Sequence, residues 1–362
     1  MSTRVVSRNQ WVALQCGSLP IMGHFLLIAN VLRTAGRDAW LSALIGIPVG
    51  FLFAAVLLAL RRRWKGTPLV DGIYHLAGPV GGTLISALLV LYFFSIGVIT
   101  LRGLEQFVTS VFMPETPYIV IGVSFILLVA WAMYRDIETV ARTAIVLVLF
   151  IIITGTTVGT NLMQEKHYVR IFPILENGWP PVLAGALLFS SLWSELISVL
   201  VFRSKPYSLK REAQGWTSLI LFNGILFILS VLSPVTMFDM PLATHFSWPG
   251  QAEVRLIKFG IFDRNDIYGL FTMTAGSLIR ITLFLFAACE TIAHTVPISS
   301  YKSAIGPVAA VTLIVSLLPF WNDAIYSLIL QYFYTYSFLL ILIPLGLLLL
   351  PVKNKKTKRS TC

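Results

Sequence analysis

The segment Ser190-Ser191-Leu192-Trp193-Ser194-Glu195 lies in the middle of the apolar run Pro181–Phe202. It places three serines and a carboxylate where a membrane-spanning helix is otherwise apolar. An ionised carboxylate near the centre of a bilayer is costly, so it is usually neutral, paired or turned toward a cavity. We therefore interpret Glu195 as a residue for ligand contact, proton coupling or gating. The alternative is a protonated, hydrogen-bonded packing residue.

A second interruption lies in the first apolar run, Gln10–Leu32, where Gly17-Ser18-Leu19-Pro20 and Gly23 fall near the middle. Proline has no amide hydrogen and glycine weakens a helix, so we expect the backbone to open there. Taken alone, this segment fits a simple proline kink equally well. The first and sixth spans are corresponding positions in a five-plus-five inverted repeat, where paired interruptions indicate a midplane substrate site. Together the two segments predict a ligand cavity.

Composition places the rest of the chain in the membrane as well. The chain has 362 residues, of which 57% are hydrophobic and 12% are charged, whereas a soluble domain has about 25% charged residues. Long apolar runs alternate with short charged connectors, and most are near the ~20 residues that cross a bilayer. We expect an all-α polytopic membrane protein with about ten transmembrane helices. The expected spans are Gln10–Leu32, Trp40–Leu60, Gly82–Phe112, Tyr118–Tyr134, Thr139–Thr160, Pro181–Phe202, Trp216–Met237, Ile267–Cys289, Tyr301–Leu318 and Ala324–Leu350.

The basic residues predict the orientation of these spans. The net charge is +11, but the basic residues stand in short blocks between apolar runs, which does not favour nucleic-acid binding. On the side that holds the N-terminus 18 of the 27 Lys and Arg residues gather, and 7 lie on the opposite side. Since cytoplasmic connectors are enriched in Lys and Arg, we expect both termini to be cytoplasmic. One transmembrane domain would cover residues 1–352, and the basic tail 353–362 would lie along anionic lipid headgroups.

Two further charged groups lie within expected spans. Arg102 and Glu105 are three residues apart in the third span and can pair on one helix face, either as a gating element or as a self-neutralised structural pair. Arg280 in the eighth span has no acid within one turn, so it needs a partner from another helix. Glu195 and Glu105 are the candidates.

The ligand site is expected between the two interruptions, with two polar residues of the eighth span at its edge. A broken helix attracts a carboxylate at the N-terminus of one half and an ammonium at the carbonyl end of the other, so an amino acid would suit it. Small residues there would let the ligand approach the backbone, and we expect bulkier residues at Gly17 or Ser191 to exclude the ligand and leave folding largely intact. The candidate ligand-binding residues are Gly17, Ser18, Pro20, Gly23, Ser190, Ser191, Ser194, Glu195, Thr274 and Ser277.

The sequence gives no indication of an enzyme, a metal or a cofactor. It contains no Walker loop, no GxGxxG and no HExxH, and no GxSxG elbow accompanies its serines. Its three cysteines, Cys16, Cys289 and Cys362, are too few and too scattered for a metal site or a disulfide framework.

Several motifs, in order along the chain, resemble those of one family. Gln10 opens the first span, the glycine–proline interruption follows, and Ala35-Gly36-Arg37-Asp38-Ala39-Trp40-Leu41-Ser42 leads into the second. Glu138-Thr139-Val140-Ala141-Arg142 opens the fifth span, and Thr116-Pro117 precedes the fourth. Trp248-Pro249, Val254-Arg255-Leu256-Ile257 and Phe262-Asp263-Arg264-Asn265-Asp266 lie in the connector before the eighth. This set resembles the B subunits of spore germinant receptors.

The resemblance implies a fold of the amino acid–polyamine–organocation superfamily, with an inverted repeat and broken first and sixth helices. It also implies a subunit in the inner membrane of bacterial endospores that works with an A and a C subunit. Such a subunit would bind a small nutrient, commonly an amino acid, and thereby trigger germination. The alternative function is a proton-coupled amino acid transporter that uses Glu195, because one fold hosts both activities.

Overall fold

The computed structural model describes residues 5–64, 67–204, 209–256, 266–296, 298 and 300–349. Within these residues the chain is helical almost throughout. The α-helices are α1 (Arg8–Pro20), α2 (Ile28–Ala35), α3 (Ala39–Arg63), α4 (Leu69–Val111), α5 (Tyr118–Tyr134), α6 (Ile137–Leu162), α7 (Trp179–Leu192), α8 (Leu209–Met237), α9 (Met240–His245), α10 (Pro249–Val254), α11 (Ile267–Thr295), α12 (Lys302–Ser316), α13 (Asp323–Ser337) and α14 (Leu342–Leu349).

Irregular helical turns and one small sheet complete the description. The longest are the π-helix η1 (Ile21–Leu26) and the 3₁₀-helix η5 (Trp193–Val201). The two-residue strands β1 (Val5–Val6) and β2 (Arg203–Ser204) pair in parallel, a small exception to the expected all-α class. The shorter 3₁₀ turns are η2 (Gly36–Asp38), η3 (Met163–Glu165), η4 (Tyr168–Ile171) and η6 (Phe338–Ile341).

The expected class of an all-helical membrane protein is confirmed, apart from the short β1–β2 pair. Two shorter apolar helices, α5 and α12, accompany the long ones. The first expected span is not one long helix, because it is divided among α1, η1 and α2. Seven helical segments among the described residues are long and apolar enough to cross a membrane: Ile28–Arg63, Leu69–Val111, Ile137–Glu165, Trp179–Val201, Lys210–Met237, Ile267–Thr295 and Asp323–Leu349.

The interruption of the first span lies about one turn later than expected. The α-helical conformation of α1 continues through Gly17 and Pro20, and the wider π-helical turn begins at Ile21. The irregularity therefore misses Gly17–Pro20 but contains Gly23, the other residue at which the opening is expected. An added Cβ at Gly23 would lie 2.2 Å from the ring of Phe227 in α8. A glycine permits this close approach of the two helices, and the wider turn accommodates a helix whose Pro20 lacks an amide donor.

The irregularity of the sixth span falls inside the predicted segment. Helix α7 passes into the tighter 3₁₀-helix η5 at Trp193, so Glu195 lies in its first turn. The expected third span also differs, because α4 begins before it and bends at Gly78, whose φ of 74° is not helical. A positive φ strains the backbone of an L-residue that carries a Cβ, and glycine avoids this strain.

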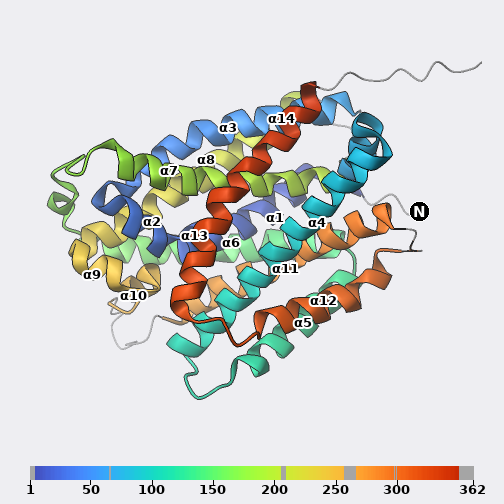
Figure 1. The fold of residues 1–362 in the computed structure, drawn as a ribbon. Coiled ribbons are helices and arrows are strands. Elements are labelled where there is room, and N and C mark those ends of the chain that lie inside the picture. Colours follow the sequence, from blue (N-terminus) through green and yellow to red (C-terminus); the bar gives the residue numbers. More distant parts are fainter. Residues whose placement is uncertain are drawn as a thin grey trace, which may run out of the picture.

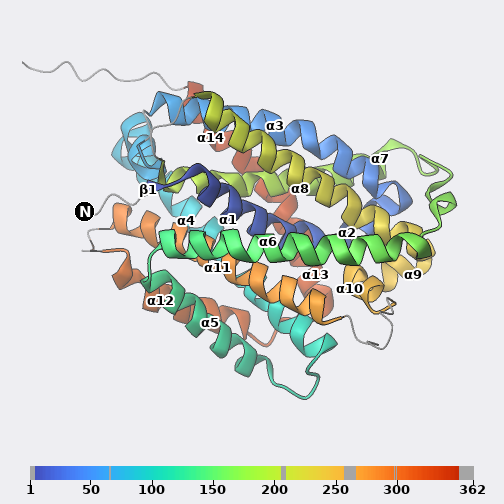
Figure 2. The same ribbon diagram turned by 180° about the vertical axis from the view of Figure 1, so that it is seen from behind.

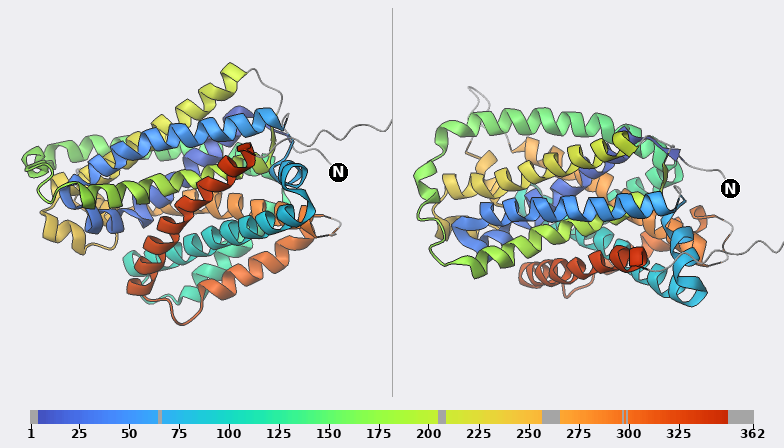
Figure 3. Two further views of the ribbon diagram at one scale, coloured as in Figure 1. Left: turned by 45° about the horizontal axis from the view of Figure 1, so that its top comes forward. Right: turned by 90° about the horizontal axis from the view of Figure 1, so that it is seen from above.

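The helices form a layered bundle in which α1 is central (Figures 1 and 2). Helix α3 packs on α7 and α8, and α4 packs on α11, while α1 contacts α6, α8 and α11. The described part of the connector after α8, Phe238–Leu256, folds into α9 and α10 at the end of the bundle opposite the N-terminus (Figure 3). We call the two ends of the bundle the N-terminal end and the α10 end. Asp263, Arg264 and Asn265 of the family-like cluster lie outside the described residues, as does the basic tail.

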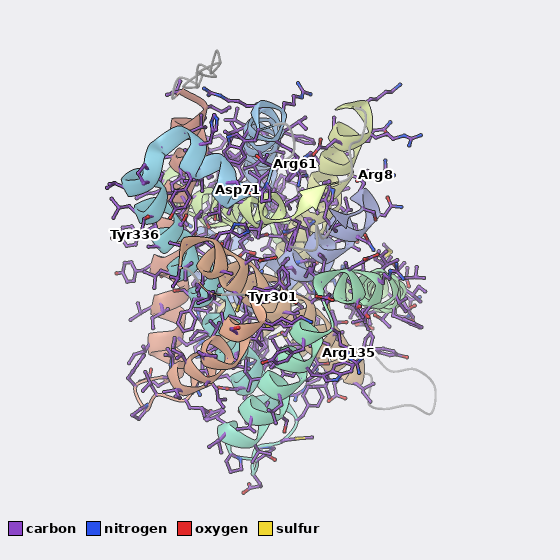
Figure 4. The ribbon with its side chains drawn as sticks, turned by 90° about the vertical axis from the view of Figure 1, so that its right-hand side faces the viewer. Arg8, Arg61, Asp71, Arg135, Tyr301 and Tyr336 are labelled. Atoms are coloured by element: carbon purple, nitrogen blue, oxygen red, sulfur yellow. The ribbon has the colours of Figure 1, made fainter. Side chains whose placement is uncertain are left out.

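The N-terminal end gathers the connectors in which basic residues are frequent. This one end holds Arg8, Arg61 and Asp71 of three helices, Arg135 directly after α5 and Tyr301 directly before α12 (Figure 4).

Candidate functional site

The centre of the bundle contains a buried ion pair between two helices that are far apart in sequence. Arg280 of α11 donates through Nη1 to Oε2 of Glu195 at 2.6 Å and through Nη2 to Oε1 at 2.5 Å. Both side chains have 0% of their surface exposed. Two parallel hydrogen bonds between charged groups form the strongest kind of side-chain contact, and they fix the orientation of both partners.

Three further residues complete the hydrogen bonding of this pair. Tyr334 of α13 donates to Oε1 of Glu195 at 2.8 Å and accepts from Arg280. Arg280 also donates to the Ser18 carbonyl at 3.2 Å, to the Ser18 hydroxyl at 3.3 Å and to Thr100 Oγ1 at 2.9 Å. The network therefore joins α1, α4, η5, α11 and α13.

The structure brings only part of the predicted ligand site together. Ser18 and Glu195 meet at Arg280, and Ser194 accepts or donates a 2.6 Å hydrogen bond with Tyr92 beside them. Ser191 is buried and donates to the carbonyl of Leu188. Six predicted residues make no hydrogen bond to the side chain of Arg280 or Glu195 in the described part of the chain: Gly17, Pro20, Gly23, Ser190, Thr274 and Ser277. None of the ten predicted residues lines the two cavities described below. Their role in ligand binding stays a prediction.

A larger residue at Gly17 would meet neighbouring side chains in this arrangement. An added Cβ at Gly17 would lie 2.6 Å from Ile279 Cδ1 and 3.1 Å from Val148 Cγ2. Such contacts require neighbouring side chains to move, because protein interiors are close-packed. Gly17 therefore serves helix packing between α1 and α11 in this arrangement.

The second charged pair, Arg102 and Glu105, is looser than the first. Arg102 Nη1 lies 3.5 Å from Glu105 Oε2, and both residues are buried. Arg102 also donates to the Trp321 carbonyl at 3.1 Å, and its guanidinium lies 4.2 Å from the ring centre of Tyr118. Glu105 accepts a shorter bond, 2.9 Å, from Ser316. The partner of Arg280 is thus Glu195, and Glu105 pairs within its own helix.

Two adjoining cavities lie toward the α10 end of the bundle. The larger, about 820 Å³, is lined by residues of α2, α4, α10 and α13, among them Asn30, Gln106, Gln251 and Tyr326. The smaller is about 560 Å³ and shares part of its lining with the larger. Its lining residues are Arg102, Gln106, Tyr118, Trp321, Asn322, Asp323 and Ala324.

Sequence reasoning missed most of these cavity residues. Asn30 and Gln106 carry uncharged amides, and Asp323 stands at a helix start, so none of them contrasts with its surroundings as Glu195 does. Two amides within expected apolar spans were the available signal. Among the described residues, no three His, Cys, Asp or Glu side chains converge as a metal site would require.

Helix α13 connects the cavities with the central ion pair. Tyr326 and Leu330 line the larger cavity, and Tyr334 contacts Glu195 and Arg280. Residues four apart lie on one face of a helix, so this face of α13 extends from the cavity to the ion pair. Tyr326 also donates to the Ile99 carbonyl of α4 at 3.0 Å. A displacement of α13 would therefore reach both sites.

The N-terminal end is closed by contacts around the end of η5. Arg61 of α3 pairs with Glu212 at 2.9 Å and donates to the carbonyls of Val199 and Phe202. The β1–β2 pairing lies immediately after this point in the chain. These contacts hold the end of η5 that follows Glu195.

Comparison of the sequence with known proteins identifies a family. The sequence profile of the family described as "Spore germination protein" matches residues 12–324. The chain belongs to the spore germination protein family. The predicted resemblance to B subunits of spore germinant receptors is thereby confirmed, as is the expectation of a non-enzymatic protein.

Members of this family with curated names include two similar proteins. Spore germination protein XB of Bacillus anthracis is 25% identical over 271 residues, which cover 75% of this chain and 76% of that protein. Spore germination protein KB of Bacillus subtilis (strain 168) is 23% identical over 281 residues, covering 74% of this chain and 72% of that protein. Both alignments span most of the transmembrane part.

A solved structure has the same fold as this spore germination protein. Mhp1, a transporter of the nucleobase-cation-symport-1 family in a closed conformation with bromovinylhydantoin bound, superimposes with a TM-score of 0.62. The match covers 90% of this chain and 75% of Mhp1 at 13% sequence identity. At this identity the likeness concerns the fold, and it agrees with the expected inverted-repeat architecture.

Proposed function

We propose that this chain is the nutrient-sensing membrane subunit of a spore germinant receptor. It binds a small nutrient, an amino acid, and with an A and a C subunit triggers germination from the inner membrane of the endospore. Family membership supports the germination role. The observation that carries the sensing role is the buried Arg280–Glu195 pair, because it joins five elements between an outer cavity and a closed N-terminal end.

The proposal places the nutrient at the meeting point of the first and sixth spans. In the arrangement seen here Arg280 bonds to Ser18 and Glu195, so a nutrient must displace or reorient this guanidinium to reach them. A ligand changes an equilibrium only through a difference in affinity between the two states. Competition of the nutrient for the partners of Arg280 supplies that difference and moves α13 through Tyr334.

The proposed topology has ten spans in two inverted repeats of five, with both termini in the cytoplasm. The 18-to-7 distribution of basic residues and the location of Arg8, Arg61 and Arg135 at one end support it. A reporter fused after Cys362 should be active only in a cytoplasmic assay. External labelling of that fusion would contradict the proposed orientation.

The test of function separates a receptor subunit from a transporter. Spores that carry Glu195→Gln should lose the nutrient response per receptor present, with receptor abundance measured in parallel, because the neutral amide cannot hold Arg280 in the paired state. Vesicles that contain this chain alone should show no substrate-driven flux. Flux that depends on Glu195 without partner subunits would instead establish the proton-coupled amino acid transporter. A full nutrient response of Glu195→Gln spores would overturn the proposed role of the pair.

A further inference from the structure

Arg102 has more hydrogen-bond donors than the described residues satisfy. A guanidinium carries five N–H groups, and Arg102 is 4% exposed. Its Nη2 donates to the Trp321 carbonyl at 3.1 Å, its Nη1 lies 3.5 Å from Glu105, and its Nε has no partner among the described residues. Arg280, by comparison, bonds to its carboxylate at 2.5 and 2.6 Å. Buried donors are nearly always bonded, so Arg102 lacks an acceptor.

The smaller cavity supplies room for that acceptor. Arg102 lines it together with Gln106, Tyr118, Trp321, Asn322, Asp323 and Ala324. Asp323 accepts from Gln106 at 3.2 Å through Oδ1, and among the described residues no donor bonds to its Oδ2. The cavity is thus lined by a buried cation, Arg102, and by an exposed carboxylate, Asp323, together with the aromatic side chains of Tyr118 and Trp321.

We propose that this smaller cavity binds an α-amino acid as a zwitterion, at a site separate from the midplane. The ligand carboxylate bonds to Arg102, the ammonium bonds to Asp323, and Tyr118 and Trp321 cover the side chain. This inference rests on the proposed function and adds a second, outer site for the same amino acid beside the proposed midplane site.

The charges around the cavity select a zwitterion over other small ligands. A plain carboxylic acid would meet Arg102 but would also face Asp323 and, behind Arg102, Glu105. A plain amine would pair with Asp323 but leave the donors of Arg102 unsatisfied. Only a ligand with both a carboxylate and an ammonium group pairs with both Arg102 and Asp323. Mismatched or unpaired charges lower the affinity of the other ligands for such a site.

A ligand at this site would contact α13, the helix that also contacts the Arg280–Glu195 pair. Asp323 is the first residue of α13, and Trp321 and Asn322 belong to the turn that precedes it. The same helix carries Tyr326 at the larger cavity and Tyr334 at the Arg280–Glu195 pair. A ligand held between α4 and the start of α13 therefore acts on the helix that ends at the ion pair.

The experiment uses the full chain, purified in lipid nanodiscs, and twenty amino acids as probes. Each probe is compared with its C-terminal amide and its N-acetyl derivative by isothermal titration. At least one amino acid should bind, and both of its derivatives should bind about tenfold more weakly or worse, which is about 1.4 kcal/mol. Arg102→Gln and Asp323→Asn should each cause a similar loss for the parent amino acid. The matched controls Arg142→Gln and Glu138→Gln, an exposed pair on α6, should leave binding unchanged.

A second variant protects the test against misfolding. Arg102→Gln leaves Glu105 without its cation, so Arg102→Lys, which keeps the charge but not the two-pronged geometry, is measured beside it and should weaken binding less. Equal binding of the amino acid and its amide, unchanged binding in Asp323→Asn and Arg102→Lys, or no binding by any of the twenty would overturn the inference. Germination of spores distinguishes failure of this inference from failure of the proposed function. If the nutrient response requires this chain but is normal in the Arg102→Lys and Asp323→Asn variants, only the inference fails. A nutrient response in spores that lack the chain refutes the proposed function.

Discussion

At the scale of single residues, substitution of one partner of the Arg280–Glu195 pair should lower the free energy of unfolding more than substitution of both. Removing one partner of a buried pair leaves an uncompensated charge and costs about 3–5 kcal/mol, whereas apolar replacement of both is often neutral. We expect Glu195→Met and Arg280→Met each to lower the unfolding temperature in detergent more than the double variant does. Thermal unfolding of the three variants checks this.

Arg142→Gln provides the control for the loss of one charge, because its side chain is 72% exposed and its pair is a surface pair. It should change the unfolding temperature little. Additive losses in the double variant would show that the two charges contribute independently, against the geometry described.

A second prediction for single residues concerns Gly17 and the amount of folded protein. Gly17→Val should reduce the amount of folded protein, because its side chain would enter the space of Ile279 and Val148. Gly155→Val is the control, since an added Cβ there meets no atom within 4 Å. Immunoblots of membrane fractions compare the two. Normal abundance of Gly17→Val together with a lost nutrient response would restore the interpretation of Gly17 as a ligand contact.

Sequence reasoning at the residue scale succeeded where a charge contrasts with its surroundings. Glu195, Arg280, Arg102 and Glu105 are conspicuous in apolar runs, and all four lie buried in the two ion pairs. The choice between Glu195 and Glu105 as the partner of Arg280 could not be made, since it depends on packing between helices distant in sequence. Asp323 was overlooked because a charge at a helix start is ordinary on its own.

At the scale of elements, α10 contains a buried carboxyl that makes stability depend on pH. Glu253 is 4% exposed and accepts from Ser233 of α8. Burial raises the pKa of Glu253 to about 8, although the hydrogen bond from Ser233 and the charge of Lys166 oppose the shift. Between the ordinary pKa of the group and about 8 the folded protein binds more protons than the unfolded chain, so stability falls as pH rises through this window.

The corresponding test compares thermal unfolding at pH 6 and pH 9. The parent chain should unfold at a lower temperature at pH 9, and Glu253→Gln should lose much of that difference because its amide needs no proton. Glu176→Gln is the control, as Glu176 is 52% exposed in its surface pair with Arg37. An unchanged pH dependence in Glu253→Gln would mean that ionisation of Glu253 does not lower the stability of the folded protein.

The sequence located both interruptions of the spans but not their geometry. Glycine, proline and serine indicate that a helix is weakened, yet they do not say whether it bends, widens to a π-turn or tightens to a 3₁₀-turn. At Gly23 the outcome depends on Phe227 of α8, and at Trp193 on its indole, which donates to the Gly46 carbonyl of α3. Both neighbours come from other helices.

At the scale of the whole molecule, the two ends of the bundle differ in access. Cavities open toward the α10 end, while Arg61, Glu212 and the β1–β2 pair close the N-terminal end. Ser110→Cys, in the cavity lining, should react with a membrane-impermeant thiol reagent added on the side opposite a C-terminal tag. In a Cys362→Ser background, Ser198→Cys, which is fully buried beyond Glu195, should not react from either side.

The two native buried cysteines, Cys16 and Cys289, serve as internal references, since they should stay unlabelled in every variant. Labelling of Ser198→Cys from the tagged side would show a molecule open at the N-terminal end, and unlabelled Ser110→Cys would show a cavity closed to the outside.

The separation of Arg280 and Glu195 in the chain also has a consequence for biosynthesis. Glu195 leaves the ribosome 85 residues before Arg280. At about 5–20 residues per second this is a delay of roughly 4–17 s. During that interval the carboxyl group is in or near the membrane without its guanidinium, and it must be protonated, hydrated or held by the insertion machinery. The ion pair can therefore form only after eight of the expected spans have been made, so its formation reports that synthesis of the bundle is nearly complete.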